Sequence, residues 1–248
     1  LYRARTMSVK EIDKENDSWT ASVLTVTPEV FPGTLGVSNA GKSLKDGLWN
    51  LDIHDIKEYA NIENLRADGP PAGGGPGMIL RADVILPIID KIKTKTDRRP
   101  IMVMTPRGKV FNQLDAKKYS SGAGVIIICG RYEGIDQRVV DSVGALEVSI
   151  GDMVLSSGDI AASLVIDSCV RLIDGVMGKK ESSFEESFEN GLLEYPQYTL
   201  PRSYGEHEIP DILLSGNHEK IKKWRTEKSI NTTKNNRPDL WRKYLKSD

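Results

Sequence analysis

The sequence predicts an α/β protein with a mainly parallel sheet and a small helical region at its carboxyl end. Apolar segments alternate with segments of helical periodicity up to about residue 175, a pattern typical of parallel strands joined by helices. Two of the apolar segments, residues 124–134 and 147–158, run into glycine-bearing polar loops. Because glycines let the backbone touch a ligand, these loops predict a ligand site.

The first half of the chain contains one clear strand and one clear helix. Residues 22–27 are β-branched and end before a proline, so they are predicted to form the first strand. Residues 44–53 mix helix and strand patterns, so the sequence does not assign their secondary structure. Residues 68–78 alternate proline with glycine, which excludes helix and strand and indicates a shaped loop. Residues 79–93 have helical spacing, with Pro87 expected to kink or divide the helix.

The second half continues the alternation. A strand is predicted at residues 99–105, ending at Pro-Arg-Gly, and short helices are predicted at residues 115–121 and 136–143. Asp159 is expected to cap the next helix. The helical spacing predicts one buried face on that helix, formed by Ile160, Ala161, Leu164, Val165 and Leu172.

These patterns divide the chain into four parts. Residues 1–19 are predicted to be a frayed extension, in which Met7 is a candidate native start and residues 1–6 a leader or a remnant. Residues 20–178 form the predicted α/β domain, and residues 179–190, charged and serine-rich, are the linker. A final helical region starts at Asn217, within a carboxyl-terminal domain at residues 191–248.

The composition is that of a soluble globular protein. Of 248 residues, 39% are hydrophobic and 28% charged, and no apolar run approaches the roughly 20 residues of a membrane helix. Cys129 and Cys169 lie in apolar segments, outside any CxxC pair, and no signal peptide is evident. These features favour a reduced, cytoplasmic protein that does not contact membranes.

The charge is uneven along the chain. The last 33 residues carry ten Lys or Arg and four Asp or Glu, a local charge of +6, while the whole chain has a net charge of −1. A basic end on an acidic body indicates a polyanionic partner, and a solvated helical surface explains the same charges equally well.

One motif invites a different function. Residues 36–43 match the P-loop pattern GxxxxGK[ST], but Pro28, Pro32 and Gly33 separate them from the preceding strand, and no later strand ends in an aspartate suited to magnesium. A P-loop nucleotide hydrolase is therefore the weaker hypothesis. GxGxxG is also absent, which argues against an ordinary dinucleotide-binding dehydrogenase.

Five motifs, in order, resemble the bacterial tRNA (guanine-N1)-methyltransferases. They are Thr-Pro-Glu-Val-Phe at residues 27–31, Gly-Gly-Gly-Pro-Gly-Met at 73–78, Cys-Gly-Arg-Tyr-Glu-Gly-Ile-Asp at 129–136, Ser-Ile-Gly-Asp at 149–152 with Val-Leu-Ser at 154–156, and Leu-Ser-Gly-Asn-His at 214–218 with Trp224-Arg225. The resemblance covers nearly the whole chain. It implies an S-adenosylmethionine-dependent enzyme that methylates the guanine immediately 3′ of the anticodon, at position 37.

The resemblance also implies a fold that periodicity would not suggest, namely a SPOUT-type domain with a deep trefoil knot, although chains rarely form knots. In the family, the knot forms the cofactor pocket and two subunits pair with each active site between them. The residues implied for S-adenosylmethionine are Met104, Thr105, Pro106, Gly130, Tyr132, Glu133, Ile150, Gly151, Asp152, Met153, Val154, Leu155, Ser157 and Gly158. At Ser157 the family usually has glycine.

The reaction needs a base for the guanine N1 proton and a positive group for the charge on O6. The resemblance assigns these roles to Glu186 and Arg171, with Glu186 one methylene longer than the family's aspartate. Glu185 or a water is the alternative base, and an ion pair with Asp167 is the alternative role of Arg171.

For the tRNA substrate, the resemblance implies contacts from Asp68, Ser215, Asn217, His218 and Arg225. His218 could instead fix the turn before the last helical region. The loop at Asp68 departs from the family by losing an acid, an arginine and an aromatic. Magnesium is a family requirement for which the sequence assigns no ligand, and no structural metal is predicted. These departures leave a non-catalytic RNA-binding protein as the second hypothesis.

Overall fold

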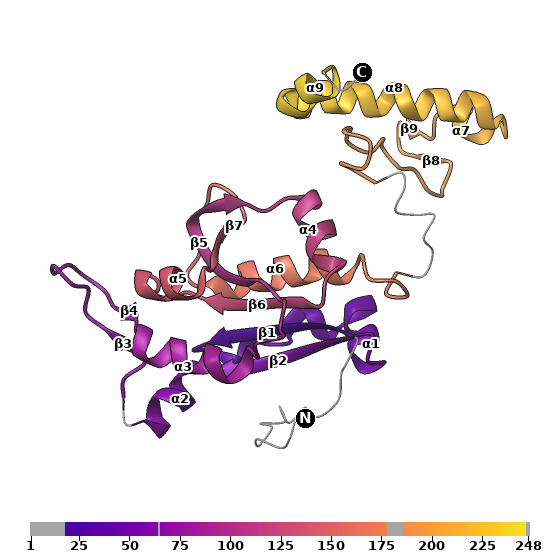
Figure 1. The fold of residues 1–248 in the computed structure, drawn as a ribbon. Helices are drawn as coiled ribbons and strands as arrows, with labels where there is room; N and C mark the ends of the chain where they lie inside the picture. Colours follow the sequence, from indigo (N-terminus) through magenta and orange to yellow (C-terminus); the bar gives the residue numbers. More distant parts are fainter. Residues whose placement is uncertain (1–17, 64, 178–185, 247–248) are drawn as a thin grey trace. The chain divides into compact units, whose positions relative to one another are not determined.

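The computed structural model describes residues 18–63, 65–177 and 186–246 (Figure 1). The chain divides into two compact units, Leu1–Met177 and Gly178–Asp248. No helix among the described residues is both long and apolar enough to cross a membrane.

The first unit is built on a five-stranded sheet in which every pairing is parallel, as predicted. Its order is β2-β1-β6-β5-β7. The strands are β1 (Trp19–Thr25), β2 (Trp49–Asp55), β5 (Ile101–Val110), β6 (Gly124–Cys129) and β7 (Leu146–Ser149). Because the strands are parallel, their carboxyl ends meet at one edge of the sheet.

Helices cover both faces of this sheet, which is why its central strands are apolar throughout. Along β6, Val125 and Ile127 pack into one core with the helices α1 (Ser38–Lys45), α4 (Gln113–Ser120) and α6 (Gly158–Val170). Ile126 and Ile128 pack into the other core with α2 (Ile56–Ile62) and α3 (Ala82–Ile92); Val139 of α5 (Gln137–Val143) joins this core. Figure 1 shows α6 running along the sheet.

The structure tests the prediction for residues 1–19 only at the end of that segment, and it assigns the ambiguous segment at residues 44–53. Residues 1–17 lie outside the described part of the chain. Trp19 is not frayed, because it begins β1 and is buried. The ambiguous segment at residues 44–53 contains the end of α1 and most of β2, so both signals were real. The two short 3₁₀ turns between β1 and α1 are Pro28–Val30 and Gly33–Gly36.

Two expected interruptions were wrong, and of the two outcomes expected at Pro87, a kink or a division of the helix, the division was wrong. The strand β5 does not stop at residues 106–108, because it resumes pairing with β7 after a bulge: both Met104 and Lys109 pair with Val148. Proline is tolerated at such a bulge. Helix α3 continues through Pro87, which lies on its exposed side. Asp68–Gly69, expected in a loop, forms the short strand β3 and pairs with β4 (Ile79–Leu80).

Helix α6 also corrects two predictions. Its cap is Ser157, whose hydroxyl accepts a hydrogen bond from the Asp159 amide, whereas the Asp159 side chain turns into the protein. Ala161 and Val165 are buried as expected, but Ile160 is 57% exposed and Leu164 is 44% exposed. The helix therefore presents a second apolar face that the described residues of this unit do not cover.

The second unit is mainly helical. It contains a hairpin of β8 (Ser203–Tyr204) and β9 (His207–Glu208), followed by α7 (Asp211–Leu214), α8 (His218–Asn236) and α9 (Pro238–Tyr244). Helix α8 begins after Asn217, as predicted, because the Asn217 side chain accepts a hydrogen bond from the Lys220 amide. Residues 179–185 of the linker predicted at residues 179–190 lie outside the described residues.

Candidate functional site

A cavity of about 850 Å³ lies at the carboxyl ends of β6 and β7, beside the bulge of β5. Two segments form much of it, here called the first glycine loop (residues 130–134, after β6) and the second glycine loop (residues 150–158, between β7 and α6). Residues 104–106 of β5 contribute a third side. The edge where strands end is the usual ligand position in open parallel sheets.

The two glycine loops touch each other directly. The Gly158 amide donates a 2.7 Å hydrogen bond to the Gly130 carbonyl, and Arg131 and Ser157 form an isolated antiparallel bridge. The approach requires glycine, since a Cβ on Gly158 would lie 2.9 Å from the Gly130 nitrogen and 3.0 Å from the Cys129 Cα. The loops that the sequence places 20 residues apart thus form one wall of the cavity.

The proline–glycine segment at residues 69–78 forms another part of the site. Its end is fastened to the first glycine loop, because the Glu133 amide donates to the Met78 carbonyl and the Leu80 amide donates to the Gly134 carbonyl, each at 3.0 Å. At Gly77 a Cβ would lie 2.4 Å from the Glu133 Cγ. The prediction of a shaped loop, rather than a flexible connector, fits these contacts.

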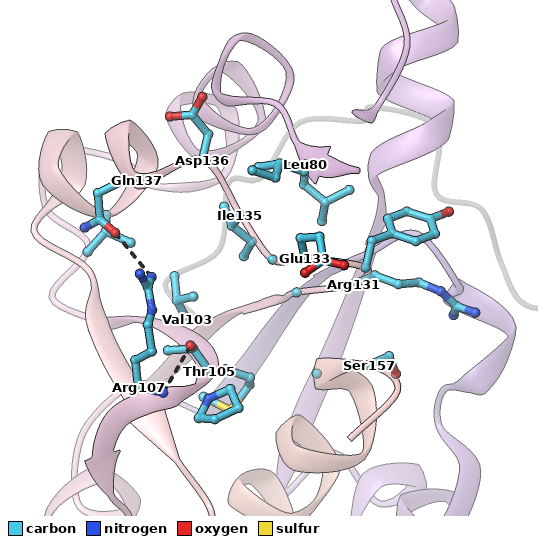
Figure 2. Close-up of a pocket in the computed structure, with 18 of the residues that line it drawn as sticks. Leu80, Val103, Thr105, Arg107, Arg131, Glu133, Ile135, Asp136, Gln137 and Ser157 are labelled. Atoms are coloured by element: carbon cyan, nitrogen blue, oxygen red, sulfur yellow. Dashed lines mark hydrogen bonds between the residues drawn. The ribbon is translucent and has the colours of Figure 1, made fainter. Parts of the chain in front are cut away.

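The cavity combines an apolar side with polar loops. Figure 2 shows Leu80, Val103 and Ile135 along one side, with Ser157 on the other. Sequence reasoning missed this apolar group, because Leu80 and Ile135 become neighbours only through an isolated bridge between distant segments. The arrangement suits a ligand with one flat apolar part and several polar groups.

Four arginines also line the cavity, namely Arg81, Arg107, Arg131 and Arg138. Most have fixed partners. Arg107 donates to Glu147 at 2.8 Å. It also donates to Gln137 at 3.2 Å (Figure 2). The hydrogen bond from Arg81 lowers the pKa of Asp83, and that from Arg138 lowers the pKa of Asp136. Three of the four arginines beside the cavity are therefore paired with an acid, an arrangement that the motifs did not indicate.

Of the residues implied for the cofactor, the structure brings twelve of fourteen to this cavity. The two that do not line it are Gly151 and Asp152, at the outer bend of the second glycine loop. That bend is fixed by Ser149, whose hydroxyl donates to the Gly151 carbonyl and accepts from the Gly151 amide. Tyr132 adopts a left-handed φ of 58°, a strained conformation of a kind that clusters at ligand sites.

The residues implied for proton transfer do not lie at this cavity within one unit. Arg171 follows the last residue of α6, and thirteen helical residues separate it from the cavity end of that helix. At 1.5 Å per residue this is roughly 20 Å, beyond the reach of an arginine side chain. Glu186 belongs to the second unit. Asp68 is not a lining residue either, although its neighbour Gly69 is, and Asp68 lies 3.8 Å from Arg66.

In the second unit, the residues implied for tRNA gather around the start of α8. Ser215 donates its hydroxyl to the Ile212 carbonyl and accepts from the Asn217 amide, so Ser215 and Asn217 fix the turn before the helix. His218 is the first residue of α8 and is exposed. Arg225 lies with its guanidinium 4.8 Å from the Tyr195 ring centroid. Each of these residues is on the surface or half-buried.

The P-loop match is a packing motif in this structure. Gly41 lies inside α1, and a Cβ there would be 2.1 Å from the Gly36 carbonyl carbon. Ser43 is 3% exposed, and its hydroxyl accepts a hydrogen bond from the Trp49 ring nitrogen at 3.1 Å. Neither the glycines nor the serine is available to a phosphate, so the structure contradicts this reading.

The thiols are inert, and the described residues hold no cluster of three or more His, Cys, Asp or Glu suited to a metal. Burial raises the pKa of Cys169 to about 12. Burial, followed by the charge of Asp159, raises the pKa of Cys129 well above its usual value. Both cysteines stay neutral at physiological pH and act as small apolar side chains.

Comparison with known proteins identifies relatives of the whole chain. A model of the family described as "tRNA (Guanine-1)-methyltransferase" matches residues 20–243. A protein of Rhodopseudomonas palustris named tRNA (guanine-N(1)-)-methyltransferase is 54% identical over 224 residues, 90% of each chain. Proteins with the same name from Nitrobacter winogradskyi and Brucella ovis are 52% and 48% identical, over 90% and 95% of this chain and 93% and 96% of their own.

These matches span both units and all five motifs, including the two glycine loops that form the cavity. The chain therefore belongs to the tRNA (guanine-1)-methyltransferase family.

Proposed function

We propose that the protein transfers a methyl group from S-adenosylmethionine to N1 of guanine 37 of tRNA, immediately 3′ of the anticodon. The observation that carries the proposal is the convergence of both glycine loops and residues 104–106 on one cavity. Its volume of about 850 Å³ is in the range of small-molecule sites. Family membership supplies the guanine N1 chemistry.

The lining residues fit such a cofactor. The apolar side at Leu80, Val103 and Ile135 suits an adenine ring, and the glycine loops expose backbone groups for its hydrogen bonds. Glu133 suits a cationic sulfonium or ammonium group. When bound, the cofactor supplies an electrophilic methyl group on its sulfonium.

The chain's own residues would handle the proton and the charge on guanine. A carboxylate, for which we propose Glu186, takes the N1 proton, and the guanidinium of Arg171 stabilises negative charge on O6. Cationic residues in the second unit and the arginines beside the cavity attract the tRNA backbone. In α8 and α9, eight Lys or Arg stand against three Asp or Glu.

We further propose that a second copy of the chain completes each site. Arg171 lies roughly 20 Å along α6 from the cavity, so it cannot serve the cavity of its own subunit. Ile160 and Leu164 form an exposed apolar face on that helix, and Val154, which lines the cavity, is 85% exposed. A homodimer would cover these side chains and could place the partner's α6 end near the cavity. The trefoil knot and a cytoplasmic location belong to this proposal.

The test is a methyl-transfer assay. Purified protein, labelled S-adenosylmethionine and a tRNA transcript with guanine 37 should give 1-methylguanine at that position by mass spectrometry of digested RNA. A matched transcript with adenine 37 should remain unmodified. Arg171→Ala and Glu186→Gln are each expected to lower kcat far more than cofactor affinity. An undiminished Glu186→Gln enzyme would move the base to Glu185 or a water.

Mixed dimers test the contribution of the partner. One subunit carries Arg171→Ala and the other carries Gly158→Ala, and the assay uses a low S-adenosylmethionine concentration at which neither homodimer is active. If Arg171 serves the partner's cavity, the mixed dimer contains one complete site and regains about half of the wild-type activity per dimer. If Arg171 serves its own cavity, the mixed dimer stays inactive.

The longer carboxylate of Glu186 keeps a second function open, namely tRNA binding without methyl transfer. A protein with this second function would bind tRNA in a filter or gel-shift assay, and it would transfer no methyl group at any magnesium concentration. Tight tRNA binding without 1-methylguanine would favour this reading over the enzyme.

A further inference from the structure

Asp159 is a buried carboxylate that the proposed chemistry does not use. It is 2% exposed, belongs to the first turn of α6, and is not among the residues that line the cavity. A buried carboxylate is unfavourable unless hydrogen bonds replace its water. Its partners therefore show what the residue holds in place.

The carboxylate is saturated by hydroxyls from two segments. One oxygen, Oδ1, accepts a 2.6 Å hydrogen bond from the Thr25 hydroxyl, and Oδ2 accepts 2.8 Å hydrogen bonds from the hydroxyls of Thr27 and Ser157. Burial, followed by the charge of this carboxylate, raises the pKa of the Cys129 thiol. Asp159 thus connects the end of β1 and the turn after it with the second glycine loop.

Only one of these partners reaches the ligand cavity. Ser157 lines it, whereas Thr25 and Thr27 do not. Ser157 is also where the two glycine loops meet, since it forms a bridge with Arg131 and precedes the Gly158 amide that bonds to Gly130. A change in the position of Ser157 would therefore shift one wall of the cavity relative to the other.

We propose that Asp159 is a positioning residue that acts through Ser157 to fix the second glycine loop against the first. Thr25 at the end of β1 and Thr27 in the turn after it hold the carboxylate, and neither residue lines the cavity. The same side chains explain how serine is accommodated where the family usually has glycine, because its hydroxyl has a buried acceptor. The effect on methyl-donor binding rests on the proposed function.

The test compares Thr27→Val, Asp159→Asn and wild type by hydrogen–deuterium exchange without ligand. Thr27→Val keeps the shape of the side chain and removes one hydroxyl, so it is informative even if Asp159→Asn fails to fold. Exchange of the backbone amides at residues 150–158 is expected to rise in both variants, while exchange in β6 stays at the wild-type rate. The control is Ser168→Ala, which removes an exposed hydroxyl on the same helix that bonds only to the Leu164 carbonyl.

The second measurement separates positioning from general stability. The KM for S-adenosylmethionine is expected to rise about tenfold in Thr27→Val, the equivalent of one charge-assisted hydrogen bond, with kcat unchanged. A lower melting temperature with wild-type exchange in residues 150–158 and an unchanged KM would overturn the proposal. A wild type that binds no S-adenosylmethionine would refute the proposed function, and the exchange data would still decide the role of Asp159.

Discussion

Residues 36–43 and the second glycine loop both place glycines beside the start of a helix, but their glycines have different tasks. In the first segment, Gly41 lets α1 pack against the backbone of Gly36, with no space left for a ligand. In the second, Gly158 lets α6 pack against Gly130, and the residues before it open onto a cavity. Both glycines permit close packing.

The difference comes from where each segment lies in the sheet. The second glycine loop follows a strand directly, at the edge where β6 and β7 end beside the bulge of β5. Residues 36–43 precede β2 at its amino end, and the Ser43 hydroxyl bonds to the first residue of that strand, Trp49. A glycine motif thus indicates a close backbone approach, and its place relative to strand ends decides whether a ligand can enter.

The largest effect is expected for Gly41→Ala. The added Cβ would overlap the Gly36 backbone, so the free energy of unfolding should fall by about 3 kcal/mol or more. Denaturant unfolding measures this loss, with Lys42→Ala on the exposed side of the same helix as the control. S-adenosylmethionine affinity of the folded fraction should not change. A fully stable Gly41→Ala protein would contradict the packing role.

Gly158→Ala should weaken cofactor binding at the second glycine loop. The Cβ would push the two glycine loops apart, and we expect the dissociation constant for S-adenosylmethionine to rise about 100-fold, or about 2.7 kcal/mol. Isothermal titration calorimetry measures this dissociation constant. Gly122→Ala is the matched control, since its Cβ would meet only the Tyr119 carbonyl, at 3.7 Å. Equal S-adenosylmethionine affinities for Gly158→Ala and Gly122→Ala would show that close packing at Gly158 does not shape the cavity.

Ser43→Ala tests the P-loop reading directly. The Trp49 ring nitrogen keeps its hydrogen bond to the Ala40 carbonyl, so the loss of stability should be only about 1 kcal/mol. Thermal or denaturant unfolding measures it. Methyl transfer should be unaffected, and ATP should bind neither the variant nor the wild type. Saturable ATP binding that Ser43→Ala abolishes would restore the nucleotide hypothesis.

The smallest effect is a pH dependence of stability from β2. Burial lowers the pKa of His54 below its usual 6.5; the charge of Asp52 opposes this shift and that of Arg99 adds to it. Below pH 6.5 the unfolded chain takes up a proton that folded His54 still refuses, so stability falls as the pH drops through this window. His54→Gln should flatten this part of a stability–pH curve. A stability–pH curve of His54→Gln identical to that of the wild type would exclude His54 as the source of this pH dependence.

Much of the fold could be predicted because local sequence patterns determine where its strands and helices form. The apolar run at residues 124–129 predicts a strand buried on both faces, and Asn217 before a helical segment predicts a cap. The failures arose where distant packing overrides local preference. Pro106 is accommodated in a bulge against β7, and Ile160 and Leu164 are exposed on a helix whose spacing predicted one buried face.

The sequence by itself determined the parallel α/β class, the two loops that follow β6 and β7, and, through five ordered motifs, the family. These are properties of consecutive residues, whose backbone preferences and apolar period do not depend on the rest of the chain. Only the tertiary structure decided that Gly158 meets Gly130, that Gly41 packs against Gly36, and that Asp159 ties β1 to the cavity. Such contacts join residues far apart in the chain, and packing of the whole sheet is what brings them together.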